Sequence, residues 1–286
     1  MPIRLIQVPY DSGHQRWRMG QGPVHLIEHG LVHRLEEAVG RVEVRTVQGA
    51  DPYALEIATT FETLREISRE VRKALESEEL PLVLAGNCNS TIGALGGCAA
   101  ADPALIWFDC HGDLNTPETS TSGFLDGMSL AMATGGCWRS MARSVPGFQP
   151  LDEERVALVG ARDLDDAELE RLERSAITWI RPDDLKRKGA ETALAPLLDR
   201  LARIAGTVYL HFDMDVHDPE QAPVNPYQTG GGLSPEEMQQ CVGAISAEIP
   251  IVGASLTSYD PDADVEDRGL KAGIDLLCHV AEVTHE

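Results

Sequence analysis

The chain has 286 residues, in which 24 Lys and Arg oppose 46 Asp and Glu, so the formal net charge is −22. This acidity argues against nucleic acid or an anionic membrane surface as a partner, because both would repel the chain. No run approaches the ~20 apolar residues of a membrane span. Residues 1–4 lack a signal-peptide layout, and the six cysteines show no paired spacing. We therefore expect a cytoplasmic protein with buried, reduced thiols.

Apolar runs typical of β-strands alternate along the chain with segments of helical period. The predicted strands are 3–8, 82–85, 105–108, 156–159, 177–180, 208–212 and 251–256. The predicted helices are 24–37, 61–80, 166–174, 191–205 and 235–247, the last with a capping box at Ser234 and Glu237. This alternation predicts one α/β domain over residues 1–286, with a parallel sheet covered by helices on both faces.

Two acidic clusters about a hundred residues apart follow two of the expected strands. Asp109, His111 and Asp113 come after the run 105–108, and Asp213 and Asp215 come after the run 208–212. Alternate residues of an extended strand point the same way, so each cluster can converge. Carboxylates crowd together when cations hold them, and two divalent ions at such a site convert water to hydroxide near neutral pH.

Two polar loops follow these clusters directly. Residues 115–127 are rich in Thr and Ser, and residues 218–232 are rich in Pro and Gly. Ligands of parallel sheets bind beyond the carboxyl ends of the strands. We therefore expect both loops to rim the metal site and to contact the substrate.

The order of these motifs resembles the ureohydrolase (arginase/agmatinase) superfamily over nearly the whole chain. The family motif Asp-Ala-His-x-Asp-x-Asn corresponds to residues 109–115, and Ser-x-Asp-x-Asp-x-x-Asp-Pro corresponds to residues 211–219. The Gly-Gly-Leu-Ser/Thr segment corresponds to residues 231–234. The resemblance implies a three-layer α/β/α fold with a central, mostly parallel sheet. It also implies a centre of two Mn²⁺ ions that hydrolyses guanidino compounds.

The resemblance also assigns a role to each acidic residue. Asp109 and Asp213 would bridge the two ions, Asp113 would complete the first, and His111 with Asp215 would complete the second. Carboxylates with one imidazole suit manganese better than a soft metal. Asp113 would also be the catalytic residue, because its free oxygen would orient the attacking hydroxide and pass a proton to the leaving amine.

The remaining ligand is a histidine in the family motif Gly-Gly-Asp-His-Ser, and this chain has none there. Alignment on Gly86 and Ser90 places Asn89 at the ligand position, whereas alignment on the downstream Ile-Gly places Cys88 there. We favour Cys88, since that alignment needs no gap and a thiolate binds a dication far better than an amide does. Without the metal site, Cys88 would be interpreted as an inert core thiol.

Three further residues would recognise an amino-acid substrate if the resemblance holds. Asn115 and Ser122 would bind the α-carboxylate, directly or through water, and Asp165 would bind the α-ammonium. The alternatives are that Asn115 and Ser122 stabilise their loop and that Asp165 caps the following helix.

Two departures from arginases bear on the substrate. Asp126 stands where arginases carry a proton-shuttling histidine, and we expect it to be the N-cap of a helix starting at Gly127. Ser258 stands where the family carries a glutamate that pairs with the guanidinium, and we expect it to be passive. A charged guanidinium without a buried counterion is costly. These departures resemble the branch that hydrolyses Nω-hydroxy-L-arginine to hydroxyurea and ornithine in D-cycloserine biosynthesis.

Other functions remain open from the sequence. One is an arginase or another guanidino or formimino amino-acid hydrolase; a formimino substrate would need a cation, for which Arg139 and Arg162 are candidates. Another class is a non-catalytic regulator that binds metal or amino acid. The short segment after Pro261 is compatible with a monomer, and a homo-oligomer stays open. His211, His217 and His279 are expected to be structural or surface residues.

Overall fold

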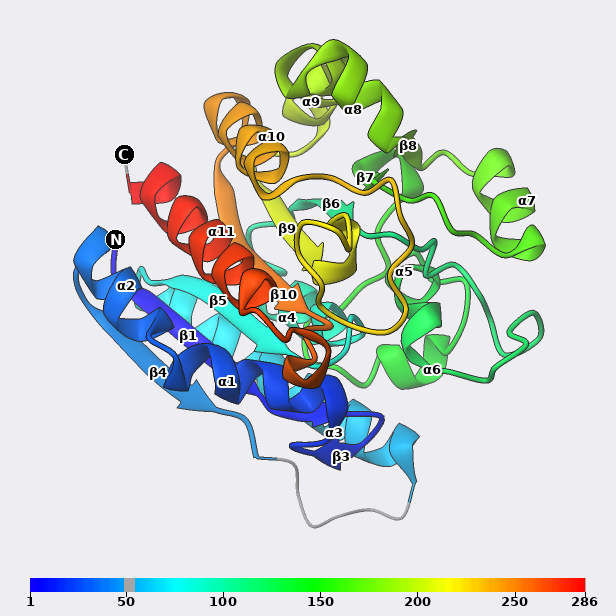
Figure 1. Cartoon of the computed structure of the whole chain (residues 1–286). Helices are drawn as coiled ribbons and strands as arrows, with labels where there is room; N and C mark the ends of the chain where they lie inside the picture. The colour runs from blue at the N-terminus through cyan, green and yellow to red at the C-terminus, as the bar shows by residue number, and fades with distance from the viewer. Residues whose placement is uncertain (49–54, 286) are drawn as a thin grey trace.

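The computed structural model describes residues 1–48 and 55–285. In this part of the chain, eight strands form one sheet in the order β4-β1-β5-β10-β9-β6-β7-β8, and all neighbouring strands are parallel (Figure 1). Their bounds are β1 Ile3–Val8, β4 Val42–Thr46, β5 Leu80–Ala85, β6 Ala104–Phe108, β7 Val156–Val159, β8 Thr178–Ile180, β9 Val208–Asp213 and β10 Ile251–Thr257. The short strands β2 Tyr10–Asp11 and β3 His14–Gln15 pair antiparallel outside this sheet.

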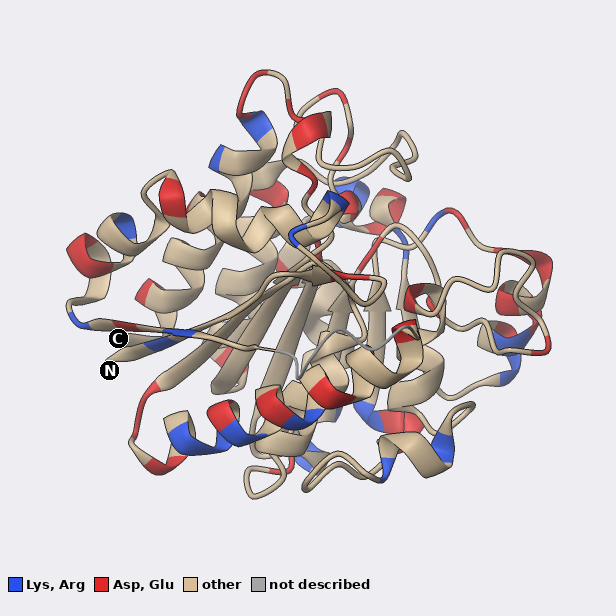
Figure 2. Cartoon of the chain, turned by 90° about the horizontal axis from the view of Figure 1, so that it is seen from below, with Lys and Arg blue, Asp and Glu red and all other residues tan. Residues whose placement is uncertain are grey.

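Helices cover both faces of the sheet, so the fold has three layers (Figure 2). One face carries α1 Gly22–Glu28, α2 Leu31–Val39, α8 Pro182–Lys188, α9 Ala190–Ile204, α10 Pro235–Glu248 and α11 Arg268–His285. The other face carries α3 Glu56–Glu76, α4 Ser90–Gly97, α5 Ser129–Ala133, α6 Arg139–Ala142 and α7 Asp166–Arg174. None of the helices in the described part combines the length and apolar character that a membrane crossing needs.

Successive strand residues enter two separate core clusters, one on each face. In β6, Ile106 and Phe108 pack toward α9 to α11, whereas Leu105 and Trp107 pack toward α3 and α4. This follows from the alternation of side chains along a strand. It explains why these strands are apolar on both sides and do not alternate with polar residues.

The predicted three-layer fold and its seven strands are confirmed, with three local differences. The helix expected at 24–37 is broken at Gly30, whose φ of 98° is incompatible with a right-handed helix, and becomes α1 and α2. The helix expected at 61–80 begins earlier and ends at Glu76, because Leu80 already starts β5. The partly exposed edge strand β4 and helices α4, α6 and α8 were not predicted. The capping box at Ser234 and Glu237 is confirmed.

Candidate metal centre

The ends of two neighbouring strands bring the two acidic clusters together. Strand β6 pairs with β9 in register Phe108 to Phe212, so Asp109 and Asp213 follow adjacent positions of the sheet. The His111 Nδ1 atom lies 3.2 Å from Asp215 Oδ2 and 3.5 Å from Asp109 Oδ1. The predicted convergence of the clusters is therefore present.

Cys88 lies in the same cluster, after β5 and before α4. Its Sγ donates to Asp213 Oδ2 at 2.8 Å and lies 3.1 Å from the Thr257 hydroxyl. The side chain is buried. Asn89 lines a different, smaller cavity beside Thr59 and Thr60 of α3. The placement supports Cys88 over Asn89 as the candidate ligand.

The buried carboxylates of the cluster repel one another, so their charged forms are unfavourable without a cation. Burial and neighbouring carboxylates raise the pKa of Asp109, Asp113 and Asp213. Burial acts in the same direction on Asp215, but the charge and hydrogen bond of His111 outweigh it and hold the pKa of Asp215 at about 2. Burial would lower the pKa of His111, but the charge of Asp215 and the hydrogen bonds with both carboxylates raise it.

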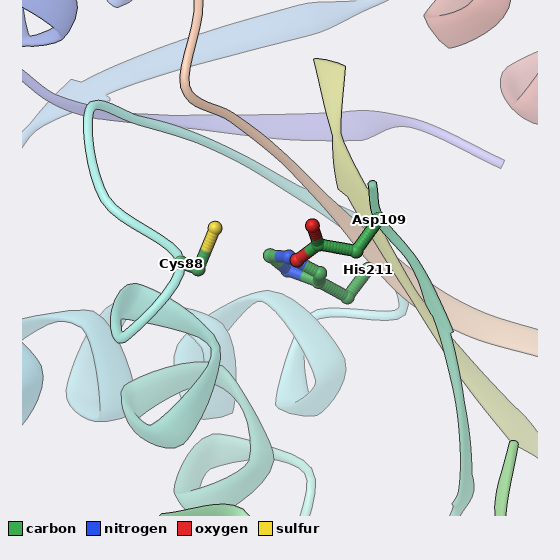
Figure 3. A group of neighbouring side chains, drawn as sticks. All are labelled: Cys88, Asp109 and His211. Atoms are coloured by element: carbon green, nitrogen blue, oxygen red, sulfur yellow. The ribbon is translucent and has the colours of Figure 1, made fainter. Parts of the chain in front are cut away.

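The donor set fits divalent metal ions. Three groups of side chains each bring their ligand atoms within 4.8 Å of one another: Asp109, Asp213 and Asp215; Cys110, His111 and Asp215; and Cys88, Asp109 and His211 (Figure 3). Buried atoms without a hydrogen-bond partner among the described residues include Asp113 Oδ2 and His211 Nε2. Carboxylate oxygens and imidazole nitrogens that lie this close together are suitable ligands for Mn²⁺ and similar ions. Asp113 lies outside the three groups.

Two further side chains hold the cluster in place: Trp107, which had no predicted role, and Ser258, which was expected to be passive. The Trp107 indole N–H donates to Asp109 Oδ2 at 2.8 Å, and the Ser258 hydroxyl donates to Asp213 Oδ2 at 2.6 Å. Ser258 therefore has a contact in the site and is not passive. Trp107, in β6, precedes Asp109 by two residues, and this spacing could have identified it as a neighbour of the cluster. His217 and His279 lie near backbone carbonyls, as expected of structural residues, but His211 adjoins the cluster.

A pocket of about 200 Å³ opens over the cluster. Both predicted loops and both acidic clusters contribute to the lining of this pocket. The complete lining is Met19, Cys88, His111, Asp113, Asn115, Phe124, Asp126, Gly127, Asp163, Asp165, Glu168, Asp213, Asp215, Asn225, Tyr227 and Ser258. Asn115 Nδ2 donates to Asp165 Oδ2 at 2.8 Å, and Asp165 also forms a capping box with Glu168 at the start of α7. Ser122 is exposed and lies outside this lining.

The expected role of Asp126 as a helix N-cap is wrong. Asp126 is itself the first residue of a 3₁₀ turn, Asp126–Met128, and its buried side chain lines the pocket. There its carboxylate accepts from Asn87 Nδ2 at 2.9 Å and from the backbone N–H of Asn89 at 3.1 Å. Burial raises the pKa of Asp126 to about 8, although these two donors oppose the shift. The carboxyl group therefore connects the pocket wall to the loop that carries Cys88.

Arg162 stabilises the backbone under the second cluster and does not reach the pocket. Its guanidinium donates to the carbonyl oxygens of Thr229 at 2.6 Å, Asp215 at 3.1 Å and Gly160 at 3.1 Å. Arg139 donates to the Gly135 carbonyl. Neither arginine lines the pocket, so neither supplies the cation that a formimino substrate with a second carboxylate would need.

Replacement of Arg162 with methionine is expected to lower the free energy of unfolding by about 2–4 kcal/mol, because several buried carbonyls lose a charged donor. Arg162→Lys should recover only part of this loss, since lysine lacks the planar fork of donors. Urea unfolding of the metal-free protein measures the change. Arg187→Met, which removes an exposed ion pair with Asp184, is the control and should change stability by less than about 0.5 kcal/mol. An equally small effect at Arg162 would contradict this interpretation.

Comparisons with known proteins agree with this geometry. The arginase family model matches residues 1–282. An arginase from Bacillus subtilis is 29% identical over 285 residues, covering 96% of both chains. A crystal structure of Bacillus subtilis arginase superposes with a TM-score of 0.89 at 28% identity over 98% of each chain. The structure of the Bacillus caldovelox arginase gives the same TM-score at 25% identity, covering 100% of this chain and 98% of that one.

Proposed function

Because the chain belongs to the arginase family of hydrolases, which cleave C–N bonds of amidines, we propose that it hydrolyses Nω-hydroxy-L-arginine to hydroxyurea and L-ornithine. One observation carries the choice of substrate. At position 258, where the resemblance predicts a glutamate for a charged guanidinium, a serine hydroxyl lines the pocket and donates to Asp213. A hydroxyguanidine is less basic than a guanidine, so it loses less by entering a site without that counterion.

Six residues would hold two manganese ions in this proposal: Cys88, Asp109, His111, Asp113, Asp213 and Asp215. When bound, the ions would lower the pKa of a water molecule and polarise the substrate. Asp113 lines the pocket with its buried Oδ2 atom free of partners among the described residues. From there it would orient the attacking water and transfer a proton to the departing amine of ornithine.

The amino-acid end of the substrate would lie at the acidic rim of the pocket. Asp165 would bind the α-ammonium and Asn115 the α-carboxylate, since both line the pocket and are held together by their hydrogen bond. The Ser122 hydroxyl accepts from the Phe124 backbone outside the pocket lining. We therefore assign Ser122 a water-mediated contact only.

The test supplies the manganese-loaded protein with Nω-hydroxy-L-arginine or with L-arginine and measures ornithine. We expect kcat/KM to be higher for the hydroxylated substrate by on the order of 100-fold, because the charged guanidinium of arginine would be buried without a carboxylate at position 258. Equal or faster release from arginine would make the protein an arginase, the activity named for its relatives. No ornithine from either, with two ions bound, would favour another amidine substrate or a regulator.

A pair of variants at one position sharpens this test. Ser258→Glu restores a carboxylate and should shift the preference toward arginine, whereas Ser258→Ala is the matched control and should leave the preference unchanged. If Ser258→Glu lowers both activities equally while two ions stay bound, the substrate argument from position 258 is wrong.

We further propose that residues 1–286 act as one domain, as a cytoplasmic monomer. All six cysteines are free, which supports a reducing compartment. Sedimentation of the manganese-loaded protein tests the oligomeric state, and a trimer would overturn the proposed monomer.

A further inference from the structure

His211 faces the acidic cluster from within the sheet. It precedes Asp213 by two residues in β9, so both side chains point to the same face of the strand. This is the face covered by α3 and α4, because Tyr209, two residues earlier, packs in that core cluster. The side chain of His211 is completely buried. Its imidazole therefore lies between the strand and the loop that carries Cys88.

Two contacts fix the orientation of the His211 ring. Its Nδ1 atom lies 2.7 Å from the Thr91 hydroxyl at the start of α4. The ring stacks on Trp107, with centroids 3.5 Å apart. The Nε2 atom is buried and has no hydrogen-bond partner among the described residues. A buried polar nitrogen without a partner costs free energy, so a binding partner for this atom would stabilise the fold.

The neighbours of the ring identify that ligand as a cation. A ring nitrogen of His211, the sulfur of Cys88 and a carboxylate oxygen of Asp109 all lie within 4.8 Å of one another (Figure 3). Two ligands of one ion are separated by up to about 4.5 Å, twice a metal–ligand bond of roughly 2.1–2.3 Å. Since Thr91 occupies Nδ1, Nε2 is the nitrogen free to bind. A polar partner on the other ring nitrogen is the usual way in which proteins orient a metal-binding imidazole.

We propose that His211 Nε2 is a ligand of the ion held by Cys88 and Asp109. The proposal rests on the proposed two-metal function. The related family motifs place histidine at position 88 and serine at position 211, and this chain has cysteine and histidine there. His211 would thus supply from β9 the imidazole that this chain lacks at position 88, while Cys88 would bind the same ion from the loop before α4.

The test is metal binding by His211→Ser, which carries the residue of the family motif. Equilibrium dialysis against Mn²⁺ is expected to show on the order of 100-fold weaker binding of one of the two ions. In the cobalt-substituted protein the visible absorption bands should shift, while the near-ultraviolet sulfur-to-cobalt band from Cys88 should persist. Tyr209→Phe is the matched control, since it changes the same face of β9 without removing a candidate ligand, and it should bind two ions normally.

Two further variants keep the proposal testable. Thr91→Val leaves the imidazole of His211 in place but removes the hydroxyl that contacts its Nδ1 atom. We expect about 10-fold weaker binding of the same ion. His211→Gln replaces His211→Ser if the serine variant does not fold. Unchanged affinity for both ions and an unchanged cobalt spectrum in the folded His211 variant would overturn the assignment of His211. Absence of metal binding by the unmodified protein would instead overturn the proposed function.

Discussion

Replacement of Asp213 with asparagine is expected to abolish binding of at least one manganese ion and to lower kcat/KM by about 10³-fold or more. Asp213 lies at the centre of the cluster, where its carboxylate accepts from Cys88 at 2.8 Å, from Ser258 at 2.6 Å and from the Asp215 backbone at 2.9 Å. An amide of the same size would not supply the negative charge that the two proposed ions would need from this position. Metal analysis of the dialysed protein and steady-state ornithine release measure the two effects.

Two observations separate this loss from misfolding. The metal-free Asp213→Asn variant should melt at the same or a higher temperature than the metal-free parent at pH 8, because a buried acid with a raised pKa has been removed. Asp218→Asn is the control in the same segment, since Asp218 accepts from Gly231 and lies outside the pocket lining. It should bind two ions and lose less than about 10-fold in kcat/KM. Full activity of Asp213→Asn would contradict the proposed metal centre.

Removal of metal is expected to destabilise the protein strongly, and more so at pH 8 than at pH 5.5. An ion at about 100 times its Kd contributes about 3 kcal/mol per site, so chelation at pH 8 should lower Tm by roughly 10 °C or more. Burial raises the pKa of Asp109, Asp113 and Asp213 in the absence of metal. Their contribution to the stability of the metal-free fold is complete below their ordinary pKa and is lost as the pH rises through the raised values.

Thermal melts at both pH values, with Mn²⁺ or with chelator, measure this dependence. The repulsion within a chain of net charge −22 also weakens the fold as pH rises. It acts on loaded and metal-free protein alike, so the difference between their Tm values isolates the cluster. Asp215, whose pKa is about 2, stays ionised across this range and adds no slope. A difference in Tm that is absent, or larger at pH 5.5 than at pH 8, would show that these carboxylates do not bind the metal.

Much of the site was readable from the sequence because it depends on local geometry. Asp109 and His111 directly follow the end of β6, and Asp213 and Asp215 lie at the end of β9 and in the 3₁₀ turn Met214–Val216 that follows it, so each pair is close in space because it is close in the chain. Parallel strands place their carboxyl ends at one edge of the sheet, which predicted the convergence of the two pairs. The break at Gly30 and the edge strand β4 were missed, since a left-handed turn and a half-exposed strand leave weak hydrophobic signals.

The layered fold, the strand ends that carry the acids and the family could all be inferred from the sequence. Which side chains meet at those strand ends depends on the order of the strands in the sheet. Strands β5, β10 and β9 are neighbours in the sheet although they are far apart in the sequence. Their adjacency places Cys88 and Ser258 against Asp213. The same packing directs His211 toward the cluster, because the partners of a buried strand residue depend on sheet order and not on chain order.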